Sequence, residues 1–508
     1  METRFTEVTG VGGVTYPRVM TSLPRSTPAD QHVDPAAILR FLDVVDGRPD
    51  IEMHSLMVVR HGQVIAEGWW APYSADRPQL LYSLSKSFTS TAAAFAQAEG
   101  MFDLDDPVVS HFPEFEADIT DPGSRAMKIR HVASMASGHT GETLGEAMAR
   151  DPGDLVRGFL LTPPDREPGT VFAYNQPCTY TLASIVQRHA GMPMTEYLRP
   201  RLFDPLGIGQ VGWQARPAGR ELGFTGLHAR TEDIAKLGQL YLQRGKWDGV
   251  QLIPETWVEA ATSKQVDNPD GFELDWSQGY GFQFWMARHG YRGDGAFGQF
   301  CVVLPEHDTV VAATAYTWQM QMVLDAMWEH LLPGLGAAAP ENGPAQEKLS
   351  ARLGGLALPA CEAAGAPADW SAWAGQPFTV AASSAQDTDK DTGIVFGTEV
   401  KPTLTAVRAA PAADGWQISL VERSNELTLP VGSGTWAVSS PADSSGDTIP
   451  VAASGGWLDD HTLRAEIIFL ETPHRMDITC SLPERGATAV WRHPPLTKSK
   501  LRDLRSPV

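Results

Sequence analysis

The chain has 508 residues, of which 43% are hydrophobic and 20% are charged, and its formal net charge is −21 at pH 7. This length exceeds one ordinary hydrophobic core, so about two or three domains are expected. The composition is typical of a soluble globular protein and excludes a disordered or fibrous one. The strong negative charge argues against nucleic acid or an anionic membrane surface as a partner.

The N-terminus and the cysteines bear on where the protein resides. The N-terminal residues contain no apolar core of a signal peptide, and no stretch is long and apolar enough to span a bilayer. A cytoplasmic protein is therefore expected. The cysteines have the spacing of neither a disulfide framework nor a metal site, so free, buried thiols are expected and neither a metal nor a cofactor is implied. They are Cys178, Cys301, Cys361 and Cys480.

The first part of the chain predicts a helix, a hairpin and a second helix. Residues 34–46 have helical periodicity behind an Asp-Pro start. Strands are expected at 55–60 and 63–69, because His61-Gly62 between them is a two-residue hairpin signal. The run at 88–99 reads as a buried helix that ends at Gly100.

The middle, from about 100 to 270, is rich in helical patterns separated by Pro and Gly turns. Strand patterns return at 280–285, 296–304 and 309–315, and a helix is expected at 318–332. Strands at both ends of a domain imply one antiparallel sheet built from distant segments, with terminal helices on one face and the helical insertion on the other.

The last third of the chain predicts a second domain of different class. Residues 336–346 lie in a Pro- and Gly-rich stretch that reads as a linker. The chain is thus divided into an α+β domain at 1–335 and a C-terminal β domain at 347–508, a sandwich or a barrel. Its short alternating segments are expected at 377–380, 393–396, 416–421, 426–429, 435–438, 462–469, 476–480 and 489–491.

The most informative residues are Ser83 and Lys86, one helical turn apart. At this spacing the lysine projects from nearly the same helix face as the serine, so its amine can reach the hydroxyl. A serine nucleophile that no histidine activates needs this arrangement. Taken alone, the pair is better explained by a capping serine and a surface lysine.

Two further segments change that balance. Tyr174 and Gln176 stand on a tight loop before a predicted helix, where a phenol beside an ammonium would ionise nearer neutrality and accept the serine proton. The Gln176 amide can contact a substrate. Residues 293–298, rich in glycine, precede a predicted strand whose N–H groups could bind an oxyanion. A buried aromatic and an ordinary turn are the alternatives for the two segments.

In this order the segments resemble the serine β-lactamase and penicillin-binding-protein-like hydrolases, in particular the branch of class C β-lactamase-like esterases, D-aminopeptidases and nylon-oligomer hydrolases. The resemblance runs from about residue 20 to 335 and includes connecting sequence at 98–108, 129–138 and 231–245. It implies the β-lactamase/transpeptidase-like fold, an antiparallel sheet flanked by helices plus an all-helical region.

The resemblance also implies roles for individual residues. Ser83 looks like the acylated nucleophile, Lys86 like its activator, and Tyr174 like the tyrosine of the family's second motif, with Gln176 at the third position of that motif. Family geometry would place the oxyanion between the backbone N–H groups of Ser83 and Ala296. Lysine and tyrosine are treated as a coupled pair, with the general base left open.

The third motif departs from the family pattern. β-Lactamases carry Lys-Thr-Gly where this chain has Gly293-Asp294-Gly295, so the lysine that receives a substrate carboxylate is missing. β-Lactam hydrolysis is therefore not expected as the main function. Asp294 could instead recognise an amine. Several aromatic residues, Trp276, Tyr280 and Trp285 among them, would suit an apolar substrate group if they line the site.

The expected function is hydrolysis of a small-molecule ester or amide through an acyl-enzyme on Ser83. The alternatives are an amide-specialised hydrolase, an acyltransferase, or a catalytically silent binding scaffold. The C-terminal domain is expected either to cap the site or to mediate a homodimer.

Overall fold

The computed structural model describes residues 8–9, 15–16, 22–268, 272–336, 343–365, 367, 369–380, 400–413 and 415–507. Contacts divide the chain into two compact units. The first unit comprises Met1–Gly68 and Leu80–Gly355, and the second comprises Trp69–Gln79 and Leu356–Pro507. Part of the predicted linker is helical, because α12 spans Pro344–Gly354 in the first unit. The predicted domain boundaries placed Trp69–Gln79 in the first domain, whereas its contacts assign it to the second unit.

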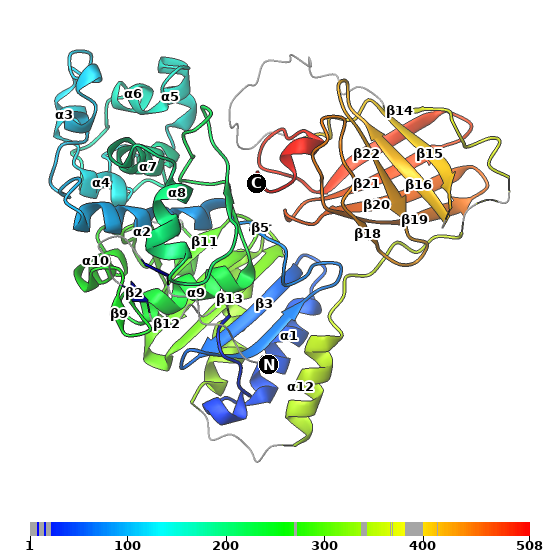
Figure 1. Cartoon of the computed structure of the whole chain (residues 1–508), viewed down its shortest axis with the longest axis horizontal. Helices are drawn as coiled ribbons and strands as arrows, with labels where there is room; N and C mark the ends of the chain where they lie inside the picture. Colours follow the sequence, from blue (N-terminus) through cyan, green and yellow to red (C-terminus); the bar gives the residue numbers. More distant parts are fainter. Residues whose placement is uncertain are drawn as a thin grey trace. The chain divides into compact units, whose positions relative to one another are not determined.

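The first unit is built on a six-stranded sheet with the order β10-β11-β12-β13-β3-β4 (Figure 1). His61 and Gly62 both adopt positive φ and form the predicted hairpin turn. Val310 lies opposite Val59, so strands from the two ends of the unit pair directly. The single antiparallel sheet assembled from distant segments is thus confirmed. Its strands are β3 (Glu52–Arg60), β4 (Gln63–Trp69), β10 (Trp285–Met286), β11 (Tyr291–Gly295), β12 (Gln299–Leu304) and β13 (Thr309–Tyr316).

Helices cover both faces of this sheet, because every residue of β12 and β13 is buried although successive side chains point to opposite faces. Helix α9 (Thr231–Leu242) packs on β3, β12 and β13. Helix α1 (Pro35–Asp46) contacts β3 and also the π-helical segment η8 (Met327–Leu331), which follows α11 (Met320–Ala326).

The helical region is centred on α2 (Ser85–Ala98) and α7 (Gln176–Ala190), which pack against each other. Helix α2 is buried from Ser85 to Ala96. The chain reverses after α2 at Gly100, which has φ 74° as a C-terminal glycine requires. The shorter helices are α3 (Pro122–Ala126), α4 (Ile129–Ala133), α5 (Leu144–Arg150), α6 (Leu155–Leu160), α8 (Met194–Leu198) and α10 (Glu255–Ala261).

The strand expected at 280–285 is wrong for most of its length, since only Trp285 and Met286 form β10. The backbone bends at Gln283, where φ is 63°. Its carbonyl groups are satisfied by α2 instead of a neighbouring strand: Ser87 donates to the Gln283 carbonyl at 3.1 Å and Ser90 to the Phe282 carbonyl at 2.7 Å. The glycine segment at 293–295 is likewise the end of β11, not the start of a strand.

The second unit contains a nine-stranded sheet with the order β17-β16-β15-β14-β22-β21-β20-β19-β18 (Figure 1). A parallel bridge from Gly432, beyond β17, to Ser454 in β19 brings the sheet back onto itself. The result is a nearly closed barrel, which decides between the predicted sandwich and barrel. The strands are β14 (Phe378–Val380), β15 (Ala406–Ala412), β16 (Gly415–Val421), β17 (Glu426–Val431), β18 (Ala437–Ser439), β19 (Val451–Asp459), β20 (Thr462–Phe469), β21 (Arg475–Ser481) and β22 (Gly486–His493).

Most strands of the barrel lie where the sequence pattern predicts them. The exceptions are β15 and β19, which the pattern missed because small and polar residues interrupt the alternation in both. The segment expected at 393–396 lies outside the described residues. The four cysteines are free and buried.

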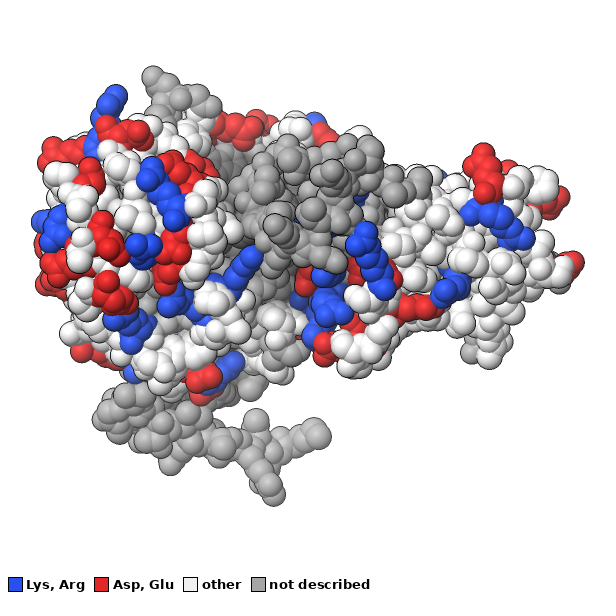
Figure 2. Space-filling view, turned by 90° about the horizontal axis from the view of Figure 1, so that it is seen from above, with Lys and Arg blue, Asp and Glu red and all other residues white. Residues whose placement is uncertain are grey.

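Charges on the surface are mixed. On the face shown in Figure 2, acidic and basic side chains lie next to one another. Exposed ion pairs such as Arg157–Asp118, at 3.0 Å, are of this kind. Within the described ranges, no helix combines the length and the apolar character of a membrane span. Those residues also bring no three His, Cys, Asp or Glu side chains together as a metal site.

Candidate active site

Ser83 lies in a tight turn at the start of α2. The chain enters this turn through Leu81, whose N–H donates to the Leu227 carbonyl at 2.8 Å, and Leu84 N–H closes the turn on the Leu81 carbonyl at 3.1 Å. Tyr82 adopts φ 47°, a left-handed conformation that costs an aromatic residue free energy and persists only where its surroundings hold it. Ser83 is partly exposed between buried neighbours. The turn therefore leaves Ser83 partly accessible to solvent.

Lys86 reaches Ser83, as their spacing predicts. Its Nζ donates to Ser83 Oγ at 3.0 Å and to the Phe224 carbonyl at 2.8 Å. The side chain is 1% exposed, and this burial lowers the pKa of the Lys86 ammonium to about 7, against the opposing influence of the Glu142 and Asp294 carboxylates. Near neutral pH, a large fraction of the amine is thus unprotonated and can accept a proton.

Tyr174 lies beside the same two residues. A hydrogen bond joins the Tyr174 and Ser83 hydroxyl groups, and Lys86 Nζ is 4.8 Å from the centre of the tyrosine ring. On its other side the ring stacks on Trp285, with 5.2 Å between ring centres. The structure thus brings together the three residues that the sequence selected for catalysis.

The expected ionisation of Tyr174 near neutrality is wrong. Burial raises the pKa of Tyr174 far above its ordinary value, and the nearby Asp294 carboxylate raises it further, while the hydrogen bond from Ser83 opposes the shift only in part. The sequence argument counted the ammonium but not the loss of water. Tyr174 is therefore a neutral phenol, and of the pair only Lys86 has a pKa near neutrality.

Glu142 is a site residue that the sequence did not reveal. Its carboxylate accepts hydrogen bonds from the N–H groups of Leu144 at 3.0 Å and of Gln176 at 3.2 Å. Next to it, the Thr143 hydroxyl donates to Asn175 Oδ1 at 3.0 Å. These bonds tie the loop to the residues directly after Tyr174. The Glu142 side chain is exposed, and a glutamate in a polar loop carries no signal of such a role.

Gln176 is the first residue of α7 and is 6% exposed. Its backbone N–H donates to Glu142, and its side-chain Oε1 is buried without a hydrogen-bond partner among the described residues. The predicted contact between this amide and a substrate stays a prediction.

The two glycines of β11 allow the strand to lie against the nucleophile turn. A Cβ at Gly293 would collide with the side chain of Ser87, and a Cβ at Gly295 with the backbone carbonyl of Leu81. Ala296 follows in a partly exposed turn, where its carbonyl accepts from Gln299 Nε2 at 3.1 Å. The close approach places the Ala296 peptide beside the nucleophile turn, as an oxyanion donor requires.

Asp294 forms an ion pair with a neighbour on its own strand. Arg292 Nε donates to Asp294 Oδ2 at 2.9 Å, and the two residues are 0% and 7% exposed. Burial raises the pKa of the Asp294 carboxyl, and the Arg292 guanidinium opposes that shift. The pair follows from strand geometry, because residues i and i+2 share one face. A buried, paired carboxylate is poorly placed to recognise a substrate amine.

Aromatic rings form a continuous cluster next to Tyr174. Trp285 contacts Tyr280 with 4.8 Å between ring centres and Phe272 with 6.1 Å, and Phe272 is 39% exposed. Trp276 lies over the Arg292 guanidinium at 4.3 Å. Of the aromatic residues noted in the sequence, Trp276, Tyr280 and Trp285 lie near the candidate site, and the cluster reaches the surface at Phe272.

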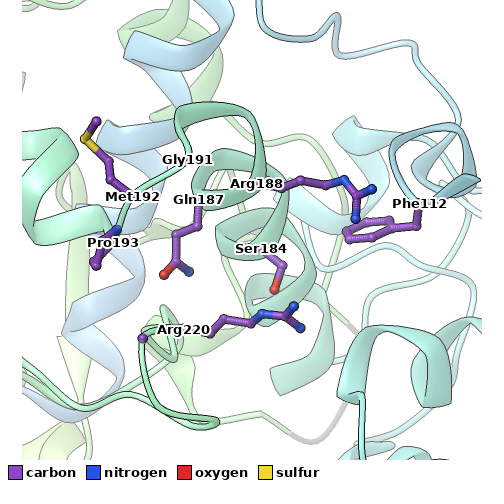
Figure 3. Close-up of a pocket in the computed structure, with 9 residues that line it drawn as sticks. Phe112, Ser184, Gln187, Arg188, Gly191, Met192, Pro193 and Arg220 are labelled. Carbon is purple, nitrogen blue, oxygen red and sulfur yellow. The ribbon is translucent and has the colours of Figure 1, made fainter. Parts of the chain in front are cut away.

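A separate cavity of about 280 Å³ lies at the far end of α7 (Figure 3). Arg188 at this cavity is paired with Glu114 at 2.6 Å and Arg220 with Asp154 at 3.0 Å. None of the candidate catalytic residues lines it. Its lining residues are Phe112, Ser184, Gln187, Arg188, Gly191, Met192, Pro193, Gly219 and Arg220.

The sheet with its helical region has the β-lactamase/transpeptidase-like fold. The family model described as Beta-lactamase matches residues 41–382, more than half of the chain. The chain therefore belongs to the Beta-lactamase family, and it is a serine hydrolase of that family.

Relatives and solved structures agree with this assignment. The 6-aminohexanoate-dimer hydrolase of Paenarthrobacter ureafaciens is 26% identical over 326 residues, which cover 56% of this chain and 81% of that protein. Lovastatin esterase of Penicillium rubens is 25% identical over 194 residues, covering 34% of this chain and 47% of the esterase. The structure of a Bacillus anthracis protein, named provisionally as a 6-aminohexanoate-dimer hydrolase, is similar with a TM-score of 0.50 and 20% identity, over 60% of this chain and 86% of that one. The structural likeness shows the fold.

Proposed function

We propose that this protein hydrolyses a small-molecule ester or amide through an acyl-enzyme on Ser83, with Lys86 as the general base and Tyr174 as a proton relay. The observation that carries the proposal is the 3.0 Å hydrogen bond between Lys86 Nζ and Ser83 Oγ, made by a lysine whose pKa burial lowers to about 7. A buried amine of this kind can activate a serine at neutral pH without a histidine.

In the acylation step, Ser83 Oγ forms a bond to the substrate carbonyl carbon and its proton passes to the neutral Lys86 amine. The backbone N–H groups of Ser83 and Ala296 stabilise the negative oxygen of the tetrahedral intermediate. The bond from carbon to the alcohol oxygen or amine nitrogen then breaks. The Lys86 ammonium returns its proton through the Tyr174 hydroxyl to that leaving group.

In the deacylation step, a water molecule takes the place of the leaving group. Lys86 accepts a proton from the water, whose oxygen bonds to the acyl carbon, and the bond to Ser83 Oγ breaks. The proton returns to Ser83, which restores the starting state and releases the acid. The high pKa of Tyr174 suits a group that passes protons on but does not ionise.

Amide substrates are a second candidate, favoured by the likeness to 6-aminohexanoate-dimer hydrolase. Comparing p-nitrophenyl acetate with a series of D-amino-acid amides and a 6-aminohexanoate dimer would decide between ester and amide preference through kcat/KM.

β-Lactam turnover is not proposed. The cation closest in sequence to the third motif is Arg292, and it is buried in its pair with Asp294. A nitrocefin assay is therefore expected to give background rates, and rapid turnover would contradict the argument from the missing lysine.

Labelling with a fluorophosphonate tests the nucleophile. Intact mass is expected to show one adduct in the wild type and none in Ser83→Ala, which should also lose p-nitrophenyl acetate hydrolysis. Ser110→Ala, at an exposed serine, is the matched control and should label like the wild type. Equal labelling and turnover in Ser83→Ala would refute the proposal and leave a silent scaffold as the explanation.

A further inference from the structure

Each of the two proposed oxyanion donors has a strained aromatic residue as its neighbour in the chain. Tyr82, directly before Ser83, has φ 47°, and Phe297, directly after Ala296, has φ 70°. Left-handed backbone costs an aromatic residue free energy, so the surrounding contacts must hold it in place. Strain of the same kind therefore occurs on both sides of the proposed oxyanion site.

The first turn fixes the direction of the Ser83 N–H group. Leu84 N–H closes this turn on the Leu81 carbonyl at 3.1 Å, and Ser85 N–H donates to the Tyr82 carbonyl. The Tyr82 carbonyl and the Ser83 N–H group belong to one planar trans peptide, so they point in opposite directions. Because the carbonyl faces the start of α2, the Ser83 N–H group points away from the helix.

The second turn fixes the Ala296 N–H group in the same way. Gly298 N–H donates to the Gly295 carbonyl at 3.2 Å. Ala296 and Phe297 are therefore the central residues of a β-turn, and glycine is the usual residue where the second of them needs positive φ. The Gly295 carbonyl and the Ala296 N–H group share one peptide, so this N–H group points out of the turn.

The side chains of Tyr82 and Phe297 connect the two turns. Their ring centres are 5.3 Å apart and their planes lie at 78°, the edge-to-face arrangement that aromatic pairs favour. Tyr82 is 7% exposed and Phe297 is 1% exposed. Glycine at position 297 would avoid the strain but could not reach Tyr82. The ring contact is thus a physical reason for an aromatic residue in this turn.

The second turn is anchored to the central sheet. Phe297 stacks on Tyr316, with 4.4 Å between ring centres, and the Phe297 carbonyl accepts a hydrogen bond from Thr317 N–H at 3.1 Å. Tyr316 is the last residue of β13 and lies opposite Glu52 of β3, in the middle of the sheet. The sheet therefore supports Phe297, and Phe297 in turn supports Tyr82.

We propose that Tyr82 and Phe297 are positioning residues whose ring contact holds the two N–H groups of the oxyanion site at a fixed separation. The inference rests on the proposed function, because it takes the N–H groups of Ser83 and Ala296 as the groups that receive the negative oxygen. An ordinary core contact adds stability only. The ring pair also determines how well the two donors fit the tetrahedral intermediate, and a misplacement of about 1 Å is costly at such a site.

The test is a double-mutant cycle in the full chain with Tyr82→Leu, Phe297→Leu and both changes together. Leucine keeps an apolar side chain at each position but removes the ring. The substrates are p-nitrophenyl acetate and its thiono analogue, in which sulfur replaces the carbonyl oxygen. Sulfur accepts hydrogen bonds from N–H groups more weakly than oxygen does, so the ratio of kcat/KM for the two esters reports on the oxyanion site.

Each single variant should lower kcat for the oxygen ester about tenfold and leave KM unchanged, because the donors act on the transition state. The thiono ester should lose no more than about threefold, since its sulfur gains less from the donors. The double variant should be no slower than the slower single variant, because either change already breaks the ring pair. The midpoint of the pH profile should not move, since Lys86 keeps its contacts with Ser83 and the Phe224 carbonyl.

Phe112→Leu is the matched control. It removes a ring that is 3% exposed and stacks on Phe115, with 5.8 Å between ring centres, far from the site in sequence. It should lower the melting temperature but leave the ratio of the two esters at the wild-type value.

Wild-type ratios in both single variants would overturn the inference, and so would equal losses with the two esters, which indicate a general distortion of the site. Single effects that multiply in the double variant would show two independent residues and would also overturn it. Should Phe297→Leu fail to fold, Phe297→Met, which fills irregular space without a ring, takes its place in the cycle. Absence of Ser83 labelling by a fluorophosphonate in the wild type would instead refute the proposed function.

Discussion

The two units bury charged side chains in different surroundings. Around Ser83 the first unit buries charged groups: Lys86, Arg292 and Asp294 are 1%, 0% and 7% exposed. In the barrel, the hydrophobic core cluster runs from Trp373 to Leu504, and the buried charges of Arg475 and Glu466, 2% and 5% exposed, form an ion pair with each other. Burial of charge costs free energy, whereas burial of apolar surface gains it. The buried Lys86 amine, whose hydrogen bonds go to the neutral oxygens of Ser83 and Phe224, therefore costs the first unit stability. The apolar core of the barrel adds stability instead.

The largest expected effect is that of Lys86→Met. Activity toward p-nitrophenyl acetate should fall by about 10³- to 10⁴-fold, because the general base is lost. The free energy of unfolding at pH 7 should hold or rise by about 1 kcal/mol, because an apolar side chain replaces a buried amine. Enzyme assays and urea unfolding measure the two effects. Lys264→Met, at an exposed lysine, should change neither, and a strongly destabilised Lys86→Met would break the contrast between the units.

Ile418→Ala tests how much the apolar core of the barrel contributes to stability. Ile418 is fully buried in β16, so truncation should cost about 2–5 kcal/mol of unfolding free energy. The rate constant of Ser83 labelling in the folded protein should stay the same. Val490→Ala, at a residue of β22 that is 53% exposed, is the control and should cost little. Slower labelling without a loss of stability would contradict a purely stabilising role for the barrel core.

Tyr174→Phe tests whether Tyr174 relays a proton or acts as the general base. Turnover should fall by about 10²-fold, because the leaving group loses its proton donor. The midpoint of the pH–rate profile should stay where it is, since the pKa of Tyr174 lies far above its ordinary value and the phenol does not titrate near neutrality. Tyr197→Phe removes a buried hydroxyl that bonds Glu99 and should leave turnover unchanged. A shifted midpoint in Tyr174→Phe would instead make the tyrosine a titrating base.

The smallest effect is the pH dependence of the wild type. Because burial lowers the pKa of Lys86 to about 7, kcat/KM should rise with pH to a plateau above that value and be about tenfold lower at pH 6. A flat profile between pH 5.5 and 8 would argue against Lys86 as the base.

The lowered pKa of Lys86 also makes the free energy of unfolding depend on pH. Between pH 7 and the ordinary value of 10.5, the unfolded chain holds a Lys86 proton that the folded protein lacks, so stability from this residue rises with pH. The difference in unfolding free energy between the wild type and Lys86→Met should therefore move in favour of the wild type as the pH increases through this range. Urea unfolding at several pH values measures it.

Much of the site was predictable because it depends on local geometry. The three-residue spacing of Ser83 and Lys86 fixes their meeting on a helix, and the 3.0 Å hydrogen bond follows. The glycines at 293 and 295 predicted a close backbone approach, which occurs against the nucleophile turn. The expected strand at 280–285 failed because the side chains of α2, distant in sequence, satisfy its carbonyl groups.

The sequence by itself determined the family, the sheet made from both ends of the first unit, and the serine, lysine and tyrosine of the proposed centre. Only the tertiary structure decided that Tyr174 stays neutral, that Asp294 is paired with Arg292, that Glu142 anchors the loop beside Tyr174, and that residues 69–79 belong to the barrel unit. Periodicity and spacing record local geometry. Loss of water and contacts between distant segments arise only when the chain packs, and these set the pKa values and support the strained turn at Ser83.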